Sequence, residues 1–313
     1  LLAIGGGAAV ATFWPLLSRG RFGVGRWAWR AAALASPLAF LPLLDLWRHL
    51  WGRDAQGLLP VLLGALCVAA LPGLRRRWPT GDPIGTSAMA WMGAVALGFL
   101  AVAVPLQLDR QWITVGWALE GVAALLLWRR LDHPGLKYFA LGLFLAVSAR
   151  LLLNPLVLDY GPRGPLRILN WIAWTYLTPA AALLAASRVL VPLEVGRLRE
   201  GEARFYPRRD ALIAGLLGGL GLAVIFAWMN LAVLDWFAEG ERLSLDFRRL
   251  PARDLSFSLV WALYAVFLLV LGVIRRGRLL RWGSLVLLLA TLGKVFLYDL
   301  GELEDLYRVA SLV

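Results

Sequence analysis

The sequence predicts an all-α, polytopic transmembrane helical bundle of about ten spans. Of its 313 residues, 60% are hydrophobic and 17% are charged, whereas a soluble domain carries about 45–50% apolar and about 25% charged residues. The apolar residues form long runs that short, arginine-rich loops separate. Because one globular core cannot hold so many apolar side chains, we expect most of them to face lipid.

Each predicted span is a mostly apolar run close to the length of about 20 residues that crosses a bilayer. The runs cover residues 1–17, 27–47, 58–74, 84–105, 111–128, 136–153, 166–187, 211–233, 255–274 and 281–298. A further run begins near Leu306. The chain starts with Leu1 rather than Met, and both ends lie in apolar runs, so we expect a fragment of a longer membrane protein that lacks its N- and C-terminal parts.

Basic residues in the loops predict the orientation, because Lys and Arg are retained on the cytoplasmic side of a membrane. With consecutive loops on alternate sides, 20 of the 32 Lys and Arg residues lie on the side of the first loop and 10 on the opposite side, called here the outer side. The other two, Arg150 and Lys294, lie within spans. The basic loops are therefore predicted to be cytoplasmic.

Composition and spacing argue against several other classes of protein. The net charge of +12 does not indicate nucleic-acid binding, because the arginines lie between apolar runs and not on a soluble surface. Cys67 is the single cysteine, and His49 and His133 lie in separate loops, so there is no cluster with metal-ligand spacing. We therefore expect no cofactor, no metal and no nucleic acid, and the pattern assigns no catalytic residue.

An internal repeat is predicted at an offset of 144 residues. The tripeptide Trp-Ala-Leu at 117–119 recurs at 261–263, and with the same offset Arg150 aligns with Lys294. Four spans separate the copies, so both insert in the same direction, as in the parallel repeats of some transporters. The alternative is chance similarity between leucine-rich helices. The predicted repeat units lie near residues 112–158 and 256–302.

Ionisable residues inside spans are the first site candidates, because each costs about 2.5–3.5 kcal/mol at the centre of a span. Glu120 lies near the middle of its span. It is either a proton-carrying or substrate-binding carboxyl, or a structural carboxyl held by an interhelical hydrogen bond. Arg150 and Lys294 lie near the outer ends of their spans. They either flank an outward-facing cavity or extend toward the interface within a salt-bridge network, in which Asp299 or Asp45 could neutralise them.

Asn170, Trp171 and Tyr176 are the remaining site candidates, on the seventh predicted span. Asn170 and Trp171 are predicted about one turn inside the outer end and Tyr176 about 9 Å deep, at about 1.5 Å per residue. Such side chains either join helices by hydrogen bonds or line a ligand site. With Asn230 and Asp235 at the outer end of the eighth span, the polar groups gather toward the outer side, which favours an outward-facing cavity.

A glycine-rich stretch at 215–221 predicts a helix-packing face. Gly215 and Gly219 are separated by three residues, the spacing that lets two membrane helices approach closely. No Gly-Lys-Ser/Thr follows, so the stretch is not a phosphate-binding loop.

Three stretches in order resemble the DUF2339 family of predicted bacterial membrane proteins over about residues 105–313. The first is PLQLDRQWIT at 105–114 followed by GWALEG at 116–121, the second is RLLLNP at 150–155 with Asn170, Trp171 and Tyr176, and the third is KVFLYDL at 294–300 followed by LYRV at 306–309 and Ser311. Residues 1–104 match only in general character. We therefore expect an N-terminal region of about four spans at 1–104 and a DUF2339-like region at 105–313. The resemblance implies a longer protein of the bacterial inner membrane and implies no reaction.

Three functions remain open. The first is a transporter or flippase-like protein for an envelope lipid or glycan component, motivated by the outer polar cluster and the paired cations. The second is a membrane-embedded transferase that acts on envelope glycan or lipid, for which the evident carboxyl groups are Asp45, Glu120, Asp235 and Asp299. The third is a structural subunit of an envelope complex, in which polar groups only join helices. The expected partners are membrane lipids, an envelope lipid or glycan ligand and other membrane subunits.

Overall fold

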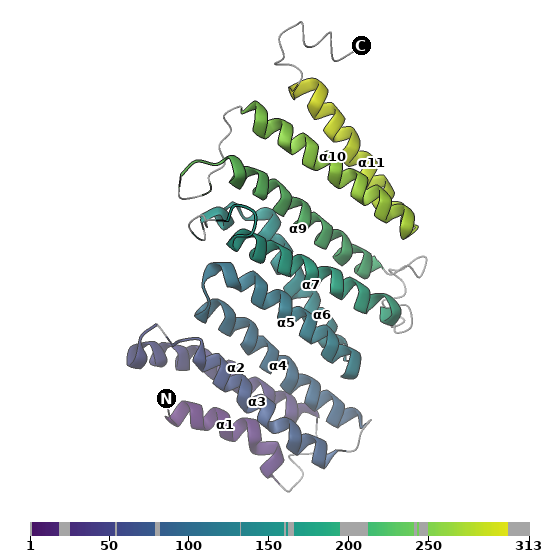
Figure 1. The fold of residues 1–313 in the computed structure, drawn as a ribbon. Coiled ribbons are helices and arrows are strands. Elements are labelled where there is room, and N and C mark those ends of the chain that lie inside the picture. The colour runs from purple at the N-terminus through teal and green to yellow at the C-terminus, as the bar shows by residue number, and fades with distance from the viewer. Residues whose placement is uncertain are drawn as a thin grey trace, which may run out of the picture. The chain divides into compact units, whose positions relative to one another are not determined.

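The computed structural model describes residues 2–18, 26–53, 55–78, 82–131, 133–159, 161, 166–194, 212–240, 243 and 250–299. Throughout this part the chain is all-α (Figure 1). Its helices are α1 (Leu2–Leu17), α2 (Arg26–Trp51), α3 (Leu58–Arg77), α4 (Pro83–Gln107), α5 (Arg110–Leu131), α6 (Pro134–Leu153), α7 (Trp171–Glu194), α9 (Leu212–Phe237), α10 (Pro251–Ile274) and α11 (Arg278–Lys294). The 3-10 helix η2 (Pro155–Asp159) follows α6, and the π-helix η3 (Val295–Asp299) follows α11.

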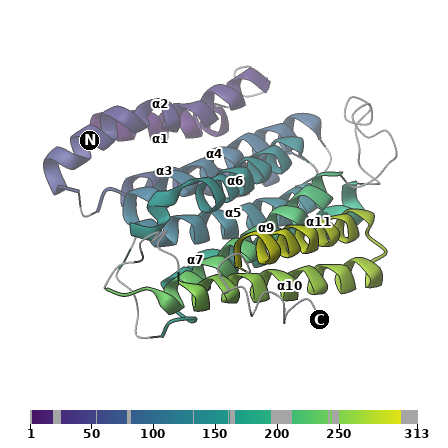
Figure 2. The same ribbon diagram turned by 90° about the horizontal axis from the view of Figure 1, so that it is seen from above.

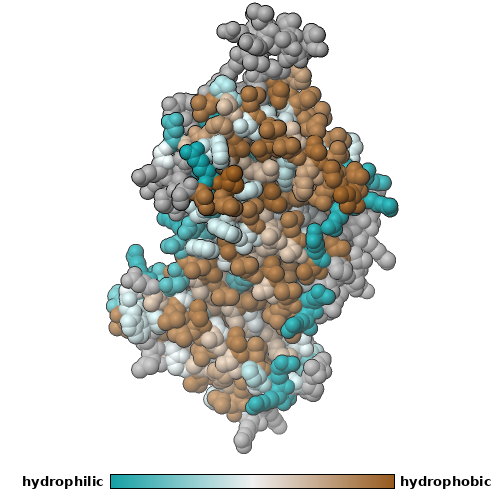
Figure 3. Space-filling view, in the orientation of Figure 1, coloured by the Kyte–Doolittle hydropathy of each residue, from teal (hydrophilic) through white to brown (hydrophobic). Residues whose placement is uncertain are grey.

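Each of the ten predicted spans coincides with one of these helices, and nine of the described helices are long and apolar enough to cross a membrane. The tenth, α1, has 16 residues, about 24 Å at 1.5 Å per residue. A bilayer core is about 30 Å thick, so its crossing stays a prediction. Hydrophobic side chains dominate the visible surface of the helices (Figure 3). The expected all-α protein with multiple membrane spans is confirmed.

Several helices begin where a polar side chain and a proline favour a helix start. Asp82 precedes α4, and its carboxylate accepts hydrogen bonds from the backbone N–H groups of Ile84 and Gly85 at 2.8 and 2.9 Å. His133 precedes α6, and its Nδ1 accepts from the N–H of Gly135 at 3.2 Å. Both helices, like α10, have proline at their first position, where the missing N–H is not needed.

The chain divides into two compact units, each described here by itself. Unit 1 comprises residues 1–157 and 177–222, and unit 2 comprises residues 158–176 and 223–313. The division passes through α7 and α9. It tests neither the predicted boundary after residue 104 nor the predicted region from 105 onward, which therefore stay predictions.

Contacts within unit 1 show that consecutive helices run in opposite directions. α3 packs against α4, α5 packs against α6, and α1 contacts α2 and α3. At one end, Arg77 Nη1 donates to the carbonyl of Pro15 at 2.9 Å, which joins the last turns of α3 and α1. At the other end, the N–H of Gly57 donates to Gln107 Oε1 at 3.2 Å, which joins the start of α3 to the end of α4. The end of α3 thus lies beside the end of α1, and its start lies beside the end of α4. This is the arrangement of helices that cross a membrane in alternating directions.

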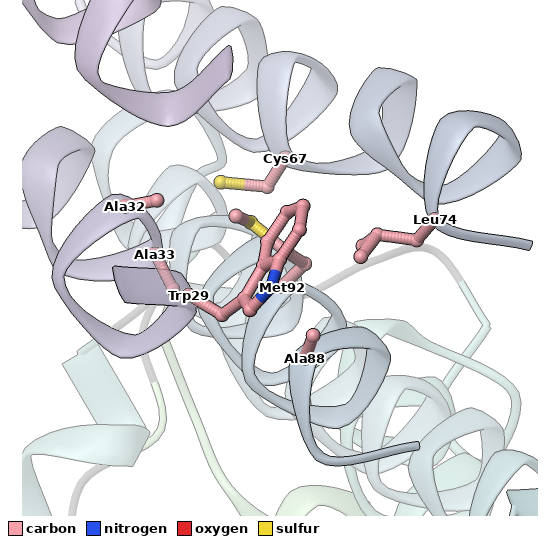
Figure 4. Packing of buried hydrophobic residues seen from close by; sticks show 7 residues of the cluster. All are labelled: Trp29, Ala32, Ala33, Cys67, Leu74, Ala88 and Met92. Atoms are coloured by element: carbon pink, nitrogen blue, oxygen red, sulfur yellow. The ribbon is translucent and has the colours of Figure 1, made fainter. Parts of the chain in front are cut away.

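A buried apolar cluster holds α2, α3 and α4 of unit 1 together (Figure 4). Trp29 projects from α2 toward Met92 of α4, and Cys67 of α3 lies beside them. The remaining members of the cluster are Ala32, Ala33, Leu74 and Ala88. Small residues around one large indole let the three helices approach closely, which gives the dispersion contacts that hold helices together where lipid supplies no hydrophobic drive.

Gly121 lets α5 and α6 approach closely, and an alanine there is expected to lower stability by about 1–3 kcal/mol. A Cβ at Gly121 would lie 2.9 Å from Cζ of Phe144, so this completely buried ring, or one of the two helices, would have to shift. At Gly142 of α6 a Cβ would meet nothing within 4 Å, so Gly142→Ala should be neutral or gain about 0.5–1 kcal/mol of helix propensity. Thermal unfolding in detergent checks this pair. Equal midpoints for the two variants would contradict the described packing.

The glycines that meet a neighbouring helix in unit 1 are not the predicted pair Gly215 and Gly219. In unit 1, Cβ atoms at Gly218 and Gly221 would meet α7, at 3.0 Å from Ser187 Oγ and 3.0 Å from Leu184 Cγ. At Gly215 and Gly219 they would meet nothing within 4 Å among the described residues. Because α9 is apolar on all sides, hydropathy does not identify which pair of glycines faces the neighbouring helix.

In unit 2, α10 and α11 form a helical hairpin and lie side by side (Figures 1 and 2). At the turn, Gly272 approaches the backbone of Arg281, where a Cβ would lie 3.0 Å from the amide nitrogen. Phe226 of α9 contacts α10, with its ring centroid 5.6 Å from Trp261 and 5.4 Å from Tyr264. Much of the surface of α10 and α11 consists of exposed leucine, valine and phenylalanine, as expected for helices in lipid.

Candidate functional site

Arg150 and Lys294 each bond to the backbone at the start of the preceding helix. In unit 1, Nη2 of Arg150 at the end of α6 donates to the carbonyl of Arg110, the first residue of α5, at 3.4 Å. In unit 2, Nζ of Lys294 at the end of α11 donates to the carbonyl of Asp254 in the first turn of α10 and to Ser258 Oγ, both at 2.8 Å. Each cation thus closes the open end of a helical hairpin.

Of the two carboxylates predicted to neutralise these cations, Asp45 does not do so, and the prediction for Asp299 is not tested. The side chain of Asp45 is 77% exposed and lies 3.8 Å from His49 of its own helix. Asp299 ends η3, but its side chain lies outside the described residues. Asp254 instead lies 3.6 Å from Nε of its neighbour Arg253. Hydropathy does not show which way a side chain points, so Asp45 could not be excluded from sequence.

Asn170 caps α7 and does not lie one turn inside it, which corrects the sequence prediction. Its Oδ1 accepts from the N–H of Ile172 at 3.0 Å and of Ala173 at 3.4 Å. This is the usual N-cap arrangement, in which an Asn side chain satisfies N–H groups that have no intrahelical partner. The helix therefore begins at Trp171, which is half-buried, and Tyr176 is buried in its second turn.

Asn170 also binds a buried carboxyl on α9. Its Nδ2 donates to Asp235 Oδ2 at 2.8 Å, and the Asp235 side chain is completely buried. Beside this pair, Nη1 of Arg167 donates to the carbonyl of Trp236 at 2.5 Å, and its guanidinium lies 5.9 Å from the centre of that indole ring. The start of α7 is thereby fixed to the end of α9 within unit 2. The sequence predicts Asn170 and Asp235 as polar groups near the outer side, but it does not predict the hydrogen bond between them.

A second amide links α9 to α10. Asn230 donates from Nδ2 to the carbonyl of Phe226 at 2.7 Å and accepts from Trp261 Nε1 at 2.8 Å. These hydrogen bonds satisfy the indole N–H inside a span, where an unsatisfied polar group is costly. The predicted place of Trp261 in a repeat does not indicate this hydrogen bond.

Glu120 is the buried carboxyl of unit 1. It is 4% exposed, and neither oxygen has a hydrogen-bond partner of good geometry in the described part of the chain. Its carboxyl lies beside the backbone of Ala101 in α4. One turn earlier on α5, Nε1 of Trp117 donates to the Ala101 carbonyl at 2.8 Å. The carbonyl of Ala101 has no intrahelical donor, because the residue four positions later, Pro105, has no N–H.

The predicted site residues are thus distributed over both units. Unit 1 contains Glu120 and Arg150, whereas unit 2 contains Asn170, Trp171, Tyr176, Lys294 and Asp299. Their convergence on one outward-facing site stays a prediction. Among the described residues, no three His, Cys, Asp or Glu side chains group as a metal site would need.

A protein-family model matches the C-terminal half of the chain. The DUF2339 model, described as a predicted membrane protein, matches residues 153–313, just over half of the chain. This range includes Asn170, Tyr176 and the stretch that begins at Lys294, whereas the resemblance of residues 105–121 lies outside it. No curated protein and no solved structure matches the chain. With its apolar helices and this match, the chain belongs to the DUF2339 family of predicted multi-spanning membrane proteins.

Proposed function

We propose that this protein is a transporter or flippase-like protein that moves an anionic envelope lipid or lipid-linked glycan across the bacterial inner membrane. The observation that carries the proposal is the equivalent placement of the two cations. Arg150 donates to the carbonyl of Arg110, and Lys294 donates to that of Asp254. Both donors and both acceptors are separated by the same 144 residues. Two helical hairpins, each with a cation bonded at the equivalent position, are the pattern expected of a parallel repeat, which some transporters contain.

Burial supports a parallel repeat of α5–α6 and α10–α11. Apart from Arg253, every described residue that is buried on α10 or α11 aligns at the offset of 144 with a buried residue on α5 or α6. The pairs are Thr114 and Ser258, Glu120 and Tyr264, Gly121 and Ala265, Ala124 and Leu268, Trp128 and Gly272, Ala140 and Ser284, and Val147 and Thr291. This agreement of buried positions favours a repeat over chance similarity of leucine content.

The indoles of the repeated tripeptide support the same relation. Trp117 donates to a carbonyl of α4, the helix before its hairpin, and Trp261 donates to Asn230 of α9, the helix before the other hairpin. In both copies the equivalent tryptophan therefore attaches the hairpin to the preceding helix. The proposed repeat therefore includes three helices in each copy, α4 to α6 and α9 to α11.

We propose the orientation with basic loops in the cytoplasm, and cysteine labelling of intact bacterial spheroplasts checks it. A membrane-impermeant maleimide should label Ala55→Cys, in the loop between α2 and α3, and should reach Ser18→Cys, after α1, only when the membrane is opened. The motive is the excess of Lys and Arg on the side of the first loop. The native Cys67 is completely buried and serves as the unlabelled control. Labelling of position 18 from outside would reverse the orientation.

Reconstitution into liposomes tests the proposed transport. Liposomes with fluorescent phosphatidylglycerol in both leaflets lose only the outer signal to an impermeant reductant unless a protein exchanges the leaflets. With the protein we expect the whole fluorescence signal to be lost. We expect a slower loss for fluorescent phosphatidylcholine, because the positive charges of Arg150 and Lys294 favour an anionic headgroup. A polyprenyl-phosphate sugar is the second substrate in the same assay. Translocation of none of these lipids would overturn the proposal.

A structural subunit is the second candidate, because several polar groups are already used between helices. Asn170 binds Asp235, Trp261 binds Asn230, and Lys294 binds Ser258. If all intramembrane polar groups only join helices, liposomes with the protein will show no exchange and the protein will co-purify with an envelope assembly. A transferase would instead consume an added lipid-linked donor without moving it.

A further inference from the structure

We propose that Glu120 is a proton-binding site that links protonation to the contact between α4 and α5. The inference goes beyond lipid transport, and only its last step, proton coupling, rests on the proposed function.

The surroundings of Glu120 do not accommodate a carboxylate anion. The side chain is 4% exposed, and both oxygens lack a hydrogen-bond partner of good geometry among the described residues. A buried charge without a partner is unfavourable, and a neutral carboxyl removes most of that cost. In the described conformation the carboxyl therefore holds a proton.

Charged groups on the helices packed against α5 are placed away from Glu120. α4 has no ionisable residue over its whole length. On α6, Lys137 lies 5.7 Å from the Trp128 ring at one end of the hairpin, and Arg150 binds Arg110 at the other, while Tyr138 is exposed. On α5 itself the other ionisable residues are Arg110, Arg129 and Arg130, in its first and last turns. No cation in the middle of the hairpin offsets a negative charge there.

The carboxyl of Glu120 lies at the contact between α4 and α5. It is one turn from Trp117, whose Nε1 donates to the carbonyl of Ala101 in α4 at 2.8 Å, and it lies beside the backbone of the same residue. A neutral carboxyl can stay buried between the two helices. Deprotonation would place a charge with no nearby cation in this contact, and a buried charge draws in water to be solvated. Deprotonation therefore weakens the contact between α4 and α5.

The second hairpin has the same contact without the titrating group. Tyr264 occupies the position 144 residues after Glu120 and packs its ring 5.4 Å from Phe226 of α9. Trp261, the equivalent of Trp117, donates to the amide of Asn230. Aromatic packing and an amide hydrogen bond do not change near neutral pH. The proton-dependent contact is therefore confined to the hairpin of unit 1.

Infrared difference spectroscopy on the protein in nanodiscs tests the proton site. At neutral pH we expect the C=O stretch of a protonated carboxyl, which disappears in Glu120→Gln and Glu120→Met and remains in the control Asp45→Asn, whose carboxyl is 77% exposed. At alkaline pH the wild-type band should convert to carboxylate bands. Wild-type protein that shows only ionised carboxylates at neutral pH, or a protonated band that both Glu120 variants retain, overturns the proposal.

Amide hydrogen exchange tests the link to the helix contact. At alkaline pH the segment 99–107 of α4 should exchange faster in the wild type than in Glu120→Gln, and at neutral pH the two should be equal, with α3 as internal reference. Equal exchange at both pH values removes the link while leaving the proton site. A lipid exchange rate that does not depend on a pH gradient would contradict proton coupling but not the proposed transport. A protonated Glu120 in a protein that exchanges no lipid would contradict the proposed transport but not the proton site.

Discussion

Replacing Asn170 by Asp is expected to destabilise the protein by about 3–5 kcal/mol, the scale of leaving a buried charge uncompensated. The new carboxyl would face Asp235 Oδ2 where the amide now donates at 2.8 Å, and Asp235 is completely buried. Aspartate caps a helix as well as asparagine does, so the bonds to Ile172 and Ala173 are kept. The loss reports the donor side of the amide, which bonds to Asp235 and, at 3.2 Å, to the carbonyl of Arg167. Thermal unfolding in detergent measures it.

A matched control and a swap make this prediction specific. Asn154 accepts from the N–H of Leu156 at 3.0 Å through Oδ1, a bond that Asn154→Asp keeps, so this variant should change the unfolding midpoint much less than Asn170→Asp. Combining Asn170→Asp with Asp235→Asn restores one amide and one carboxyl and should recover most of the loss. A swap that is no more stable than Asn170→Asp alone would contradict a direct bond between these side chains.

Replacing Lys294 by Met is the second large effect, with an expected loss of about 1.5–3 kcal/mol, the range for hydrogen bonds to charged groups. Met keeps the aliphatic stem but leaves the carbonyl of Asp254 and the hydroxyl of Ser258 without this donor. Because Lys294 is half-buried, the lower part of that range is expected. Lys294→Arg should lose less, since arginine occupies the equivalent position 150.

Arg278→Met is the control for Lys294→Met. Arg278 begins the same helix, is exposed, and should change the unfolding midpoint little. Equal losses for the two variants would mean that general charge on α11, and not the bond to α10, sets the stability of this hairpin.

The helices could be predicted from sequence because a span is a local property of about 20 residues. Asn170 shows where this fails. Hydropathy continues through 166–170, but the Asn side chain caps the backbone and starts the helix at Trp171. A stronger reading of the Asn-Trp step as a cap would have found this boundary, since Asn is a preferred N-cap residue.

The contacts of the site could be predicted only in part. Asn170 and Asp235 are 65 residues apart, and α9 is apolar on all sides, so no periodicity shows which face carries a partner. For the same reason the pair Gly218 and Gly221, and not Gly215 and Gly219, meets α7. One signal was present in the sequence, because Pro105 inside a span frees a carbonyl four residues earlier, and this carbonyl is the acceptor of Trp117.

Spin-label depth measurements test the central claim, that α5–α6 and α10–α11 are equivalent hairpins that both cross the membrane. Leu119 and Leu263, Leu126 and Val270, and Leu145 and Leu289 are exposed pairs separated by 144 residues. Nitroxides at these positions in nanodiscs, probed with oxygen and a polar nickel reagent, should report lipid contact and equal depth within each pair. Unequal depths within the pairs, or high accessibility to the nickel reagent along either hairpin, would contradict the account.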